Sequence, residues 1–118
     1  RALQAETGGF ASFLPLPVVG EGGALPSGVD MMKTLAISRL VLNNFEHVKV
    51  FWPIWTVKAA QLGLSYGADD FDGVLGEYLI AEPRRQPDGE LTGPQIEAAI
   101  HRAGFEPCER GGDYRPRS

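Results

Sequence analysis

Apolar positions along this chain alternate between the spacing of a β-strand and that of an α-helix. Residues 10–19 form a nearly continuous apolar run bounded by glycines, which is typical of a strand buried on both faces. Because prolines cannot donate ladder hydrogen bonds, Pro15 and Pro17 should end this strand near residues 14–16. Residues 46–52 and 69–75 form two further runs of strand type, whereas residues 28–44 and 57–66 place apolar residues at helical spacing. The sequence therefore predicts an α/β fold in which strands and helices alternate.

The helix at residues 28–44 carries a start signal and an apolar stripe. Ser27, followed three residues later by Asp30, is a typical helix cap, and Thr56 can cap the next helix in the same way. The side chains that we expect the longer helix to bury are Val29, Met32, Leu35, Ala36, Ile37, Leu40 and Val41.

A last helix is predicted near the end of the chain. Thr92 and Gln95 match a capping box, and Gly104 provides a stop. We expect this helix to bury Ile96, Ala99 and Ile100. Residues 105–110 have the composition of a final strand, and the tail at 111–118 is expected to be loose.

Three consecutive β–α units favour a parallel sheet, because parallel strands need crossover connections that helices usually supply. They amount to about three-eighths of a TIM-type (β/α)8 barrel, which typically has about 250 residues. An open sheet of three or four strands is the other possibility. In both folds, ligands bind at the carboxyl ends of the strands.

The third predicted strand is unusual because its sequence places polar residues among apolar ones. Asp70 and Asp72 fall on one face of it, while Phe71 falls on the other. Burying an unpaired carboxylate costs several kcal/mol, on the order of 2–7 for a polar group without a partner, so a cation should lie nearby. Lys49 on the preceding strand predicts a Lys49–Asp72 pair. The alternative is that Asp69 and Asp70 only cap a turn and that Lys49 extends to solvent.

Composition limits the classes of protein. The chain has 118 residues, enough for one domain, with 43% hydrophobic and 22% charged residues. A net charge of −4 and a pI near 5.1 argue against nucleic acids or anionic membranes as partners. No run reaches the roughly 20 apolar residues of a membrane span, and no secretory signal is visible. We therefore expect a cytoplasmic protein, and the helix-like start at residues 1–7 suggests a piece of a longer chain.

Cys108 is the one cysteine of the sequence, so no intrachain disulfide can form. With Cys108, His47 and His101 as the soft ligands, a zinc or iron–sulfur site built from this chain is not expected. No histidine is apparent near Cys108, so we do not expect it to be a catalytic nucleophile.

Four motifs occur in order along the chain: TGGF-x-x-F-x-PLP at residues 7–17, TLAISRL-x-L-x-N at 34–44, H-x-K-x-x-W at 47–52 and GADD-x-DG at 67–73. Together they resemble the C-terminal part of the radical S-adenosylmethionine (SAM) enzymes of the futalosine route to menaquinone. Aminofutalosine synthase is the nearest in pattern, cyclic dehypoxanthinyl futalosine synthase is its sister, and biotin synthase and the deazaflavin-cofactor synthases are more distant.

The resemblance implies that residues 1–118 are the C-terminal segment of a single radical SAM barrel domain and supply its sixth to eighth strands. In such enzymes the [4Fe–4S] cluster and SAM are held mainly by the first five strands, so no residue of this chain is expected to bind a cofactor. The N-terminal half of the barrel, in the same or a separate chain, would be its partner. The family reaction adds a 5′-deoxyadenosyl radical to an enolpyruvyl-benzoate, a transferase reaction that forms a C–C bond.

The resemblance also implies that the last three strands shape the substrate side of the cavity. The substrate-binding candidates are Lys49, Asp70, Asp72, Trp55 and Pro17. Lys49 could attract a substrate carboxylate and the aspartates could hold ribose or amine groups. The catalytic residues are not identified by the sequence.

The chain departs from the family pattern at residues 18–21 and 74–78, which follow predicted strands, whereas its tail keeps Glu109, Arg110 and Tyr114. Two alternatives therefore stay open. One is cyclic dehypoxanthinyl futalosine synthase or a divergent paralogue with another aromatic or nucleoside substrate. The other is a non-catalytic fragment or a subunit that completes a barrel with a partner chain.

Overall fold

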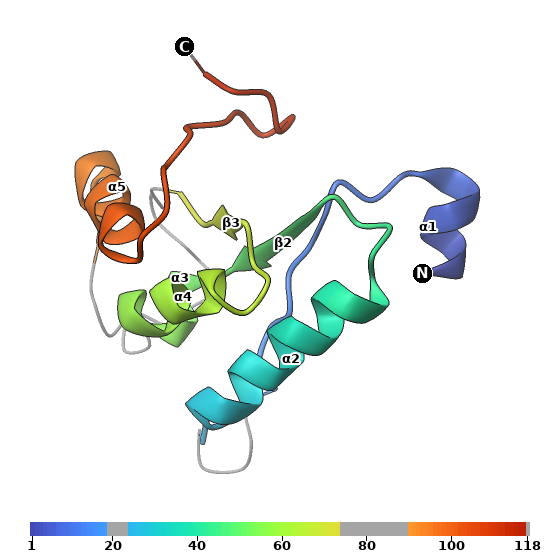
Figure 1. Cartoon of the computed structure of the whole chain (residues 1–118), viewed down its shortest axis with the longest axis horizontal. Coiled ribbons are helices and arrows are strands. Elements are labelled where there is room, and N and C mark those ends of the chain that lie inside the picture. Colours follow the sequence, from blue (N-terminus) through green and yellow to red (C-terminus); the bar gives the residue numbers. More distant parts are fainter. Residues whose placement is uncertain (19–23, 74–89, 118) are drawn as a thin grey trace.

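The computed structural model describes residues 1–18, 24–73 and 90–117, and its centre is a parallel sheet. Strand β1 (Ser12–Phe13), strand β2 (His47–Val50) and strand β3 (Asp70–Phe71) lie side by side in the order β1-β2-β3. Strands β2 and β3 are labelled at the centre of Figure 1. Ser12 pairs with His47, and Lys49 pairs with Asp70, both in parallel register. The predicted α/β fold with three parallel strands is confirmed, although each strand is shorter than predicted.

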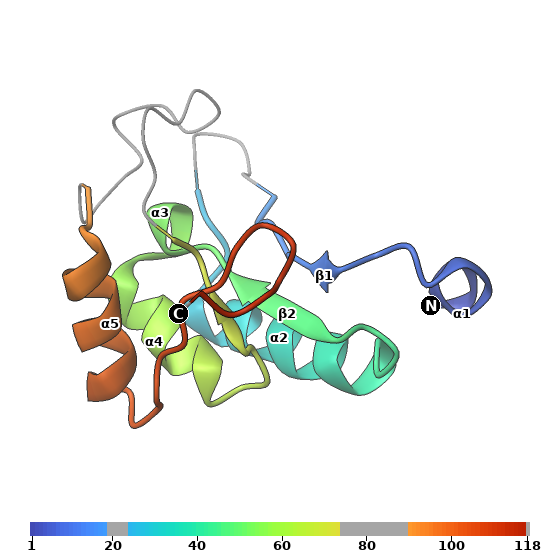
Figure 2. The same cartoon turned by 90° about the horizontal axis from the view of Figure 1, so that it is seen from above.

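The two faces of this sheet are covered differently. Helices α2 (Gly28–Val41) and α4 (Val57–Leu64) lie against one face, and α5 (Gly93–Arg102) packs beside α4. The C-terminal tail, which the structure describes over residues 109–117, crosses the opposite face, as the view from above shows (Figure 2). Two short helices complete the described elements: α1 (Ala2–Thr7), near the N-terminus, and α3 (Trp52–Trp55), directly after β2.

The core lies between β2 and the helices. Val48 and Val50 are completely buried, as is Leu35 of α2. Gly63 makes this packing possible, because a Cβ at this position would lie 2.7 Å from Val50 Cγ1 and 2.9 Å from Leu35 Cδ1. The residue without a side chain thus lets α4 approach both the sheet and α2 closely.

The predicted caps are formed. The Asp30 N–H donates to Ser27 Oγ over 3.2 Å, and the Thr92 N–H donates to Gln95 Oε1 over 2.8 Å. Thr56 Oγ1 accepts from the Ala59 N–H over 3.2 Å at the start of α4. Thr56 has a φ of 96°, a conformation that is strained for a β-branched residue.

The buried face of α2 differs from the prediction. The helix buries Met31, Met32, Leu35 and Ser38. Four residues of the predicted stripe, Val29, Ile37, Leu40 and Val41, are more than half exposed, and Leu40 is 78% exposed. Because α2 carries apolar side chains on two opposite sides, its sequence period alone could not indicate which side contacts the sheet. The helix also ends at Val41 rather than at residue 44.

Two local predictions of strands are wrong. The strand expected at 46–52 ends at Val50, because Pro53 starts the helical turn of α3. The final strand expected at 105–110 is not formed, apart from an isolated antiparallel bridge between Arg110 and Pro116. The predicted strand residues 74 and 75 lie outside the described part of the chain.

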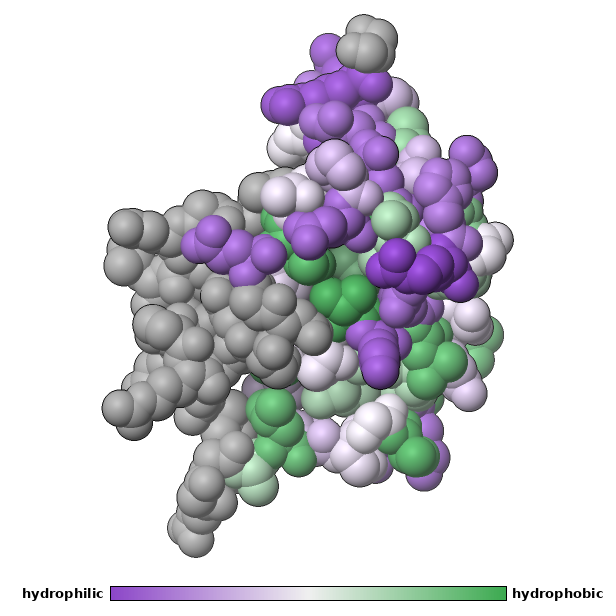
Figure 3. All heavy atoms as spheres, turned by 90° about the vertical axis from the view of Figure 1, so that its left-hand side faces the viewer, coloured by the Kyte–Doolittle hydropathy of each residue, from purple (hydrophilic) through white to green (hydrophobic). Residues whose placement is uncertain are grey.

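The tail has contacts that a loose segment would lack. Beyond the bridge to Pro116, the Arg117 N–H donates to the Glu109 carbonyl over 2.8 Å, which closes a compact turn. Hydrophilic side chains gather over this tail at the top of the space-filling view (Figure 3). Within the described residues, no helix is long and apolar enough to cross a membrane.

Candidate functional site

The polar face of the sheet brings together the charged residues that the sequence singled out. Lys49 Nζ lies 2.7 Å from Asp72 Oδ1 and 4.0 Å from Asp70 Oδ2. The side chains of Lys49, Asp72 and Asp70 are 19%, 13% and 7% exposed, respectively. The predicted Lys49–Asp72 pair is confirmed, and the alternative in which Lys49 extends to solvent is wrong.

Asp70 is held by the tail rather than left open to a ligand. Arg110 Nη2 lies 2.8 Å from Asp70 Oδ1 and 2.6 Å from Oδ2, and Arg110 Nε donates to Oδ1 over 3.0 Å. The Tyr114 hydroxyl donates to Oδ2 over 2.8 Å. Both oxygens of Asp70 thus accept hydrogen bonds from groups of the tail. Asp72, which is slightly more exposed, is the carboxylate more accessible to a ligand.

Tyr114 links the tail to β2 as well. Its ring stacks on the His47 ring at 4.3 Å between centroids, and the Arg110 guanidinium lies 4.0 Å from the centre of the same ring. Burial raises the pKa of Tyr114, and the hydrogen bond to Asp70 adds to this against the opposing effect of Ser12. The phenol therefore stays protonated and remains a hydrogen-bond donor to Asp70.

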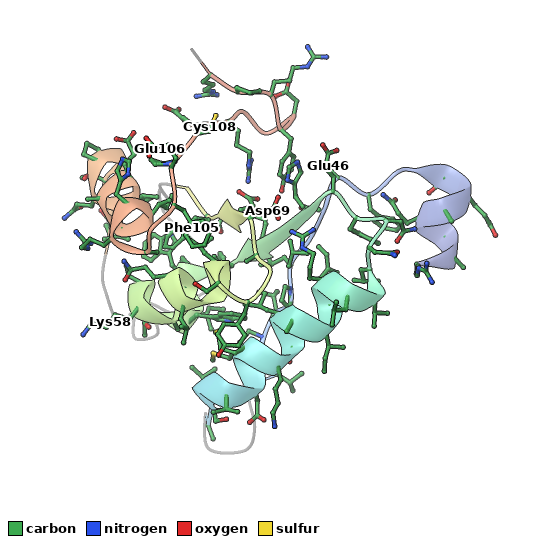
Figure 4. The ribbon with its side chains drawn as sticks, in the orientation of Figure 1. Glu46, Lys58, Asp69, Phe105, Glu106 and Cys108 are labelled. Carbon is green, nitrogen blue, oxygen red and sulfur yellow. The ribbon has the colours of Figure 1, made fainter. Side chains whose placement is uncertain are left out.

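A second carboxylate network joins the sheet to α2. Asp69 Oδ1 accepts from Arg39 Nη2 and from the Val48 N–H at 2.8 Å, while Asp69 Oδ2 lies 2.7 Å from His47 Nδ1. Burial alone raises the pKa of Asp69, but the Val48 hydrogen bond, His47 and Arg39 outweigh it and leave the pKa below its usual value. Asp69, which is labelled beside β3 in Figure 4, thus ties β2 and the start of β3 to α2.

The other two predicted site residues, Pro17 and Trp55, line one hollow of about 310 Å³. It lies where β1 and β2 end, next to the start of α2. Its lining residues are Pro15, Leu16, Pro17, Val18, Pro26, Asp30, Met31, Thr34 and Trp55. Trp55 is 4% exposed, and its Nε1 has no hydrogen-bond partner among the described residues. The hollow thus offers apolar walls, one aromatic ring and a few polar groups.

Trp52 connects the hollow beside Trp55 to the Lys49–Asp72 pair. Its Nε1 donates to the Asp72 carbonyl over 3.0 Å, which fixes α3 against the end of β3. Trp52 and Phe51 are 1% exposed, as expected for core residues. Both the charged pair and the hollow therefore lie toward the carboxyl ends of parallel strands, the position at which α/β folds bind ligands.

The described residues do not form a metal centre. No group of three or more His, Cys, Asp or Glu side chains in this part of the chain could hold a metal ion. Cys108 is exposed and lies in the segment between α5 and the tail (Figure 4). A [4Fe–4S] cluster is held by several cysteine thiolates, so the residues of this chain do not fit such a cluster.

The sequence did not reveal the roles of Arg110 and Tyr114 in the site. The sequence indicates only that both residues match the family pattern in the tail. Their contacts with Asp70 span 40 and 44 residues, and no local pattern encodes a contact at that separation. His47 and Asp69 belong to the predicted strand segments 46–52 and 69–75, but no local pattern predicts the contact between their side chains.

The family model for the CofH/MqnC C-terminal region matches residues 7–118, nearly the whole chain. The chain belongs to this family. It is 39% identical to aminodeoxyfutalosine synthase of Streptomyces coelicolor over 97% of its length, and 38% identical to that of Thermus thermophilus over 98%. It is also 36% identical, over 98% of its length, to 5-amino-6-(D-ribitylamino)uracil–L-tyrosine 4-hydroxyphenyl transferase of Methanothermobacter thermautotrophicus.

In each of these three comparisons, the match covers 34% of the relative. The CofH/MqnC C-terminal chain described here thus spans about a third of the length of the curated relatives that it matches. The resemblance to aminofutalosine synthase deduced from the four motifs is confirmed.

Proposed function

We propose that this chain is the substrate-binding part of a radical SAM transferase of the aminofutalosine synthase type. Such an enzyme adds a 5′-deoxyadenosyl radical to an enolpyruvyl-benzoate in menaquinone biosynthesis. In this proposal, residues 1–118 form the sixth to eighth strands of a (β/α)8 barrel, and a preceding segment or a partner chain supplies the others. The parallel order of β1, β2 and β3, with helices on one face and charged residues on the other, supports this placement.

The observation that carries the proposal is the Lys49–Asp72 pair on the polar face. An ammonium group has three donors, and at 2.7 Å Asp72 Oδ1 engages one of them. A substrate carboxylate could therefore bind Lys49 beside Asp72. In this arrangement, Asp72 would also accept a hydrogen bond from a hydroxyl or amine of the nucleoside.

The hollow beside Trp55 suits the aromatic part of such a substrate. Pro17, Met31 and Trp55 give it apolar walls, and the unpaired Trp55 N–H is a donor that a ligand oxygen could satisfy after a small shift. The strained backbone of Thr56, adjacent to Trp55, is also typical of ligand-binding segments.

SAM and the cluster would be bound by residues outside this chain. When bound, they supply the radical. The side chains described here would orient the acceptor and shield it from water, and no catalytic residue is assigned among them.

The test of this proposal is a product assay with the complete protein, reconstituted without oxygen and supplied with SAM. One reaction receives the enolpyruvyl-benzoate, and a parallel reaction receives L-tyrosine with 5-amino-6-(D-ribitylamino)uracil. We expect an adenosyl adduct in the first reaction by mass spectrometry. Turnover confined to the second would overturn the proposed substrate.

That second reaction represents the other candidate function, the transfer of a tyrosine-derived hydroxyphenyl group. It is supported by the 36% identity to the transferase of M. thermautotrophicus, close to the 39% found for a synthase. L-tyrosine also carries one carboxylate and one aromatic ring, so Lys49 and the hollow beside Trp55 would suit it as well.

The role of Lys49 can be tested separately by Lys49→Met in the complete protein. Loss of the ammonium group should lower kcat/KM at least about tenfold, or about 1.4 kcal/mol in the barrier. Lys58→Met is the matched control, because Lys58 is exposed on α4 and points away from the sheet (Figure 4). Equal kinetics for both variants would remove Lys49 from the substrate site.

A further inference from the structure

Arg110 is the best-fixed charged side chain of the tail. Its guanidinium makes three contacts of 2.6–3.0 Å to the Asp70 carboxylate, and its Nη1 donates to the Gly111 carbonyl over 3.0 Å. One face of the group is covered by the Tyr114 ring. The guanidinium is thus pre-arranged for Asp70 and has little freedom to serve another group.

Lys49, Asp70, Asp72 and Arg110 form one charged cluster on the polar face, and its charges balance only when Arg110 is included. Lys49 and Arg110 carry two positive charges, and Asp70 and Asp72 carry two negative charges, all on side chains that are at most 26% exposed. Without Arg110 the cluster would have a net negative charge. Lys49, which lies 2.7 Å from Asp72 but 4.0 Å from Asp70, would then have two carboxylates to neutralise.

We propose that Arg110 is a positioning residue, which neutralises Asp70 so that Lys49 remains available to a ligand carboxylate. The inference rests on the proposed function only in assuming that the ligand carries a carboxylate, which is true of both candidate substrates. Arg110 does not touch the ligand in this role. It acts through Asp70 and sets the preference of the site for a ligand that carries a carboxylate over the same ligand with an amide in its place.

The test uses the complete protein and two pairs of ligands: the enolpyruvyl-benzoate and its diamide, in which both carboxylates are replaced, and L-tyrosine and L-tyrosinamide. Calorimetry gives the dissociation constants for Arg110→Gln, Arg110→Lys and the double variant Arg110→Gln/Asp70→Asn. Arg115→Gln is the control, because Arg115 lies on the same tail but is 86% exposed and pairs with Asp113.

Arg110→Gln should weaken binding of the carboxylate ligand at least about tenfold and change binding of its amide less than about twofold. The double variant, which restores the charge balance, should return carboxylate binding to within about threefold of the original protein. The affinity of Arg110→Lys for the carboxylate ligand should lie between those of the original protein and Arg110→Gln. Arg115→Gln should have no effect. Equal losses for acid and amide, or no recovery in the double variant, would overturn the inference.

A second readout needs no substrate. Acetylation of Lys49 by acetic anhydride, followed by mass spectrometry, reports how tightly its ammonium group is held. Arg110→Gln should slow this labelling, and the double variant should restore it; an unchanged rate would contradict the proposal. If the labelling follows this order but neither acid binds the original protein, the proposed function fails while the role of Arg110 stands.

Discussion

Val48 and Lys49 are neighbours on β2, but different forces hold them in place. Val48 points toward the helices and is completely buried, so its position depends on apolar packing that excludes water. Lys49 points to the other face, where its position depends on two carboxylates and on a tail that neutralises one of them. The apolar face should tolerate substitutions that keep the volume of a buried side chain, whereas the polar face requires that positive and negative side chains stay matched.

The largest effect is expected on the apolar face, from Leu35→Ala. Leu35 is completely buried against Val50 and Gly63, so its truncation should leave a cavity and lower the free energy of unfolding by about 2–5 kcal/mol. Leu40→Ala removes the same atoms from an exposed position on the same helix and should change the free energy of unfolding by less than about 0.5 kcal/mol. Urea unfolding measures both. A similar loss for Leu40→Ala would indicate that this side of α2 is covered in solution.

On the polar face, Asp70→Asn should have the next largest effect. The substitution leaves Arg110 without its counter-charge, and breaking a largely buried pair costs about 3–5 kcal/mol, less here because Arg110 is 26% exposed. We expect a loss of about 2 kcal/mol. Asp113→Asn, at an exposed ion pair of the same tail, should cost less than about 0.5 kcal/mol. No difference between the two would mean that the tail does not dock on the sheet.

The smallest effect is a dependence on pH, and it comes from Asp69. The folded state lowers the pKa of Asp69 from its usual 3.8, so folding is favoured by this group above that pH and loses its contribution as the pH falls through the folded value. The difference in unfolding free energy between the original protein and Asp69→Asn should therefore be constant above about pH 5 and shrink below about pH 4. Because the side chain is 41% exposed, added salt should reduce the difference. A difference that grows in acid would contradict the network.

The sequence was most informative where a short segment determines its own structure. Residues such as Ser27, Thr56 and Thr92 cap helices through contacts within three residues, and the alternation in β2 placed Val48 and Lys49 on opposite faces correctly. The Lys49–Asp72 pair followed from the same alternation and from the cost of an unpaired carboxylate.

What the sequence could not predict depends on contacts between distant segments. The buried side of α2 is selected by the sheet and α4, and the apolar pattern of the helix fits two opposite sides. Asp70 was expected to face a ligand, and only the folded tail shows that Arg110 and Tyr114 engage both of its oxygens. The hollow around Trp55 likewise forms between β1, α2 and α3, which meet only in the folded chain.

The separation of the tail from its partners also has a consequence for the order of folding. Closing a loop of 40 residues costs chain entropy before any contact forms, so the tail should dock after β2 and β3 have paired. Until the tail docks, the uncovered face of the partly folded sheet carries charged rather than apolar side chains. Charged side chains disfavour association of incompletely folded chains at that surface. In refolding followed by pulsed hydrogen exchange, amides of the tail, such as that of Arg117, should be protected later than those of β3; simultaneous protection would exclude this order.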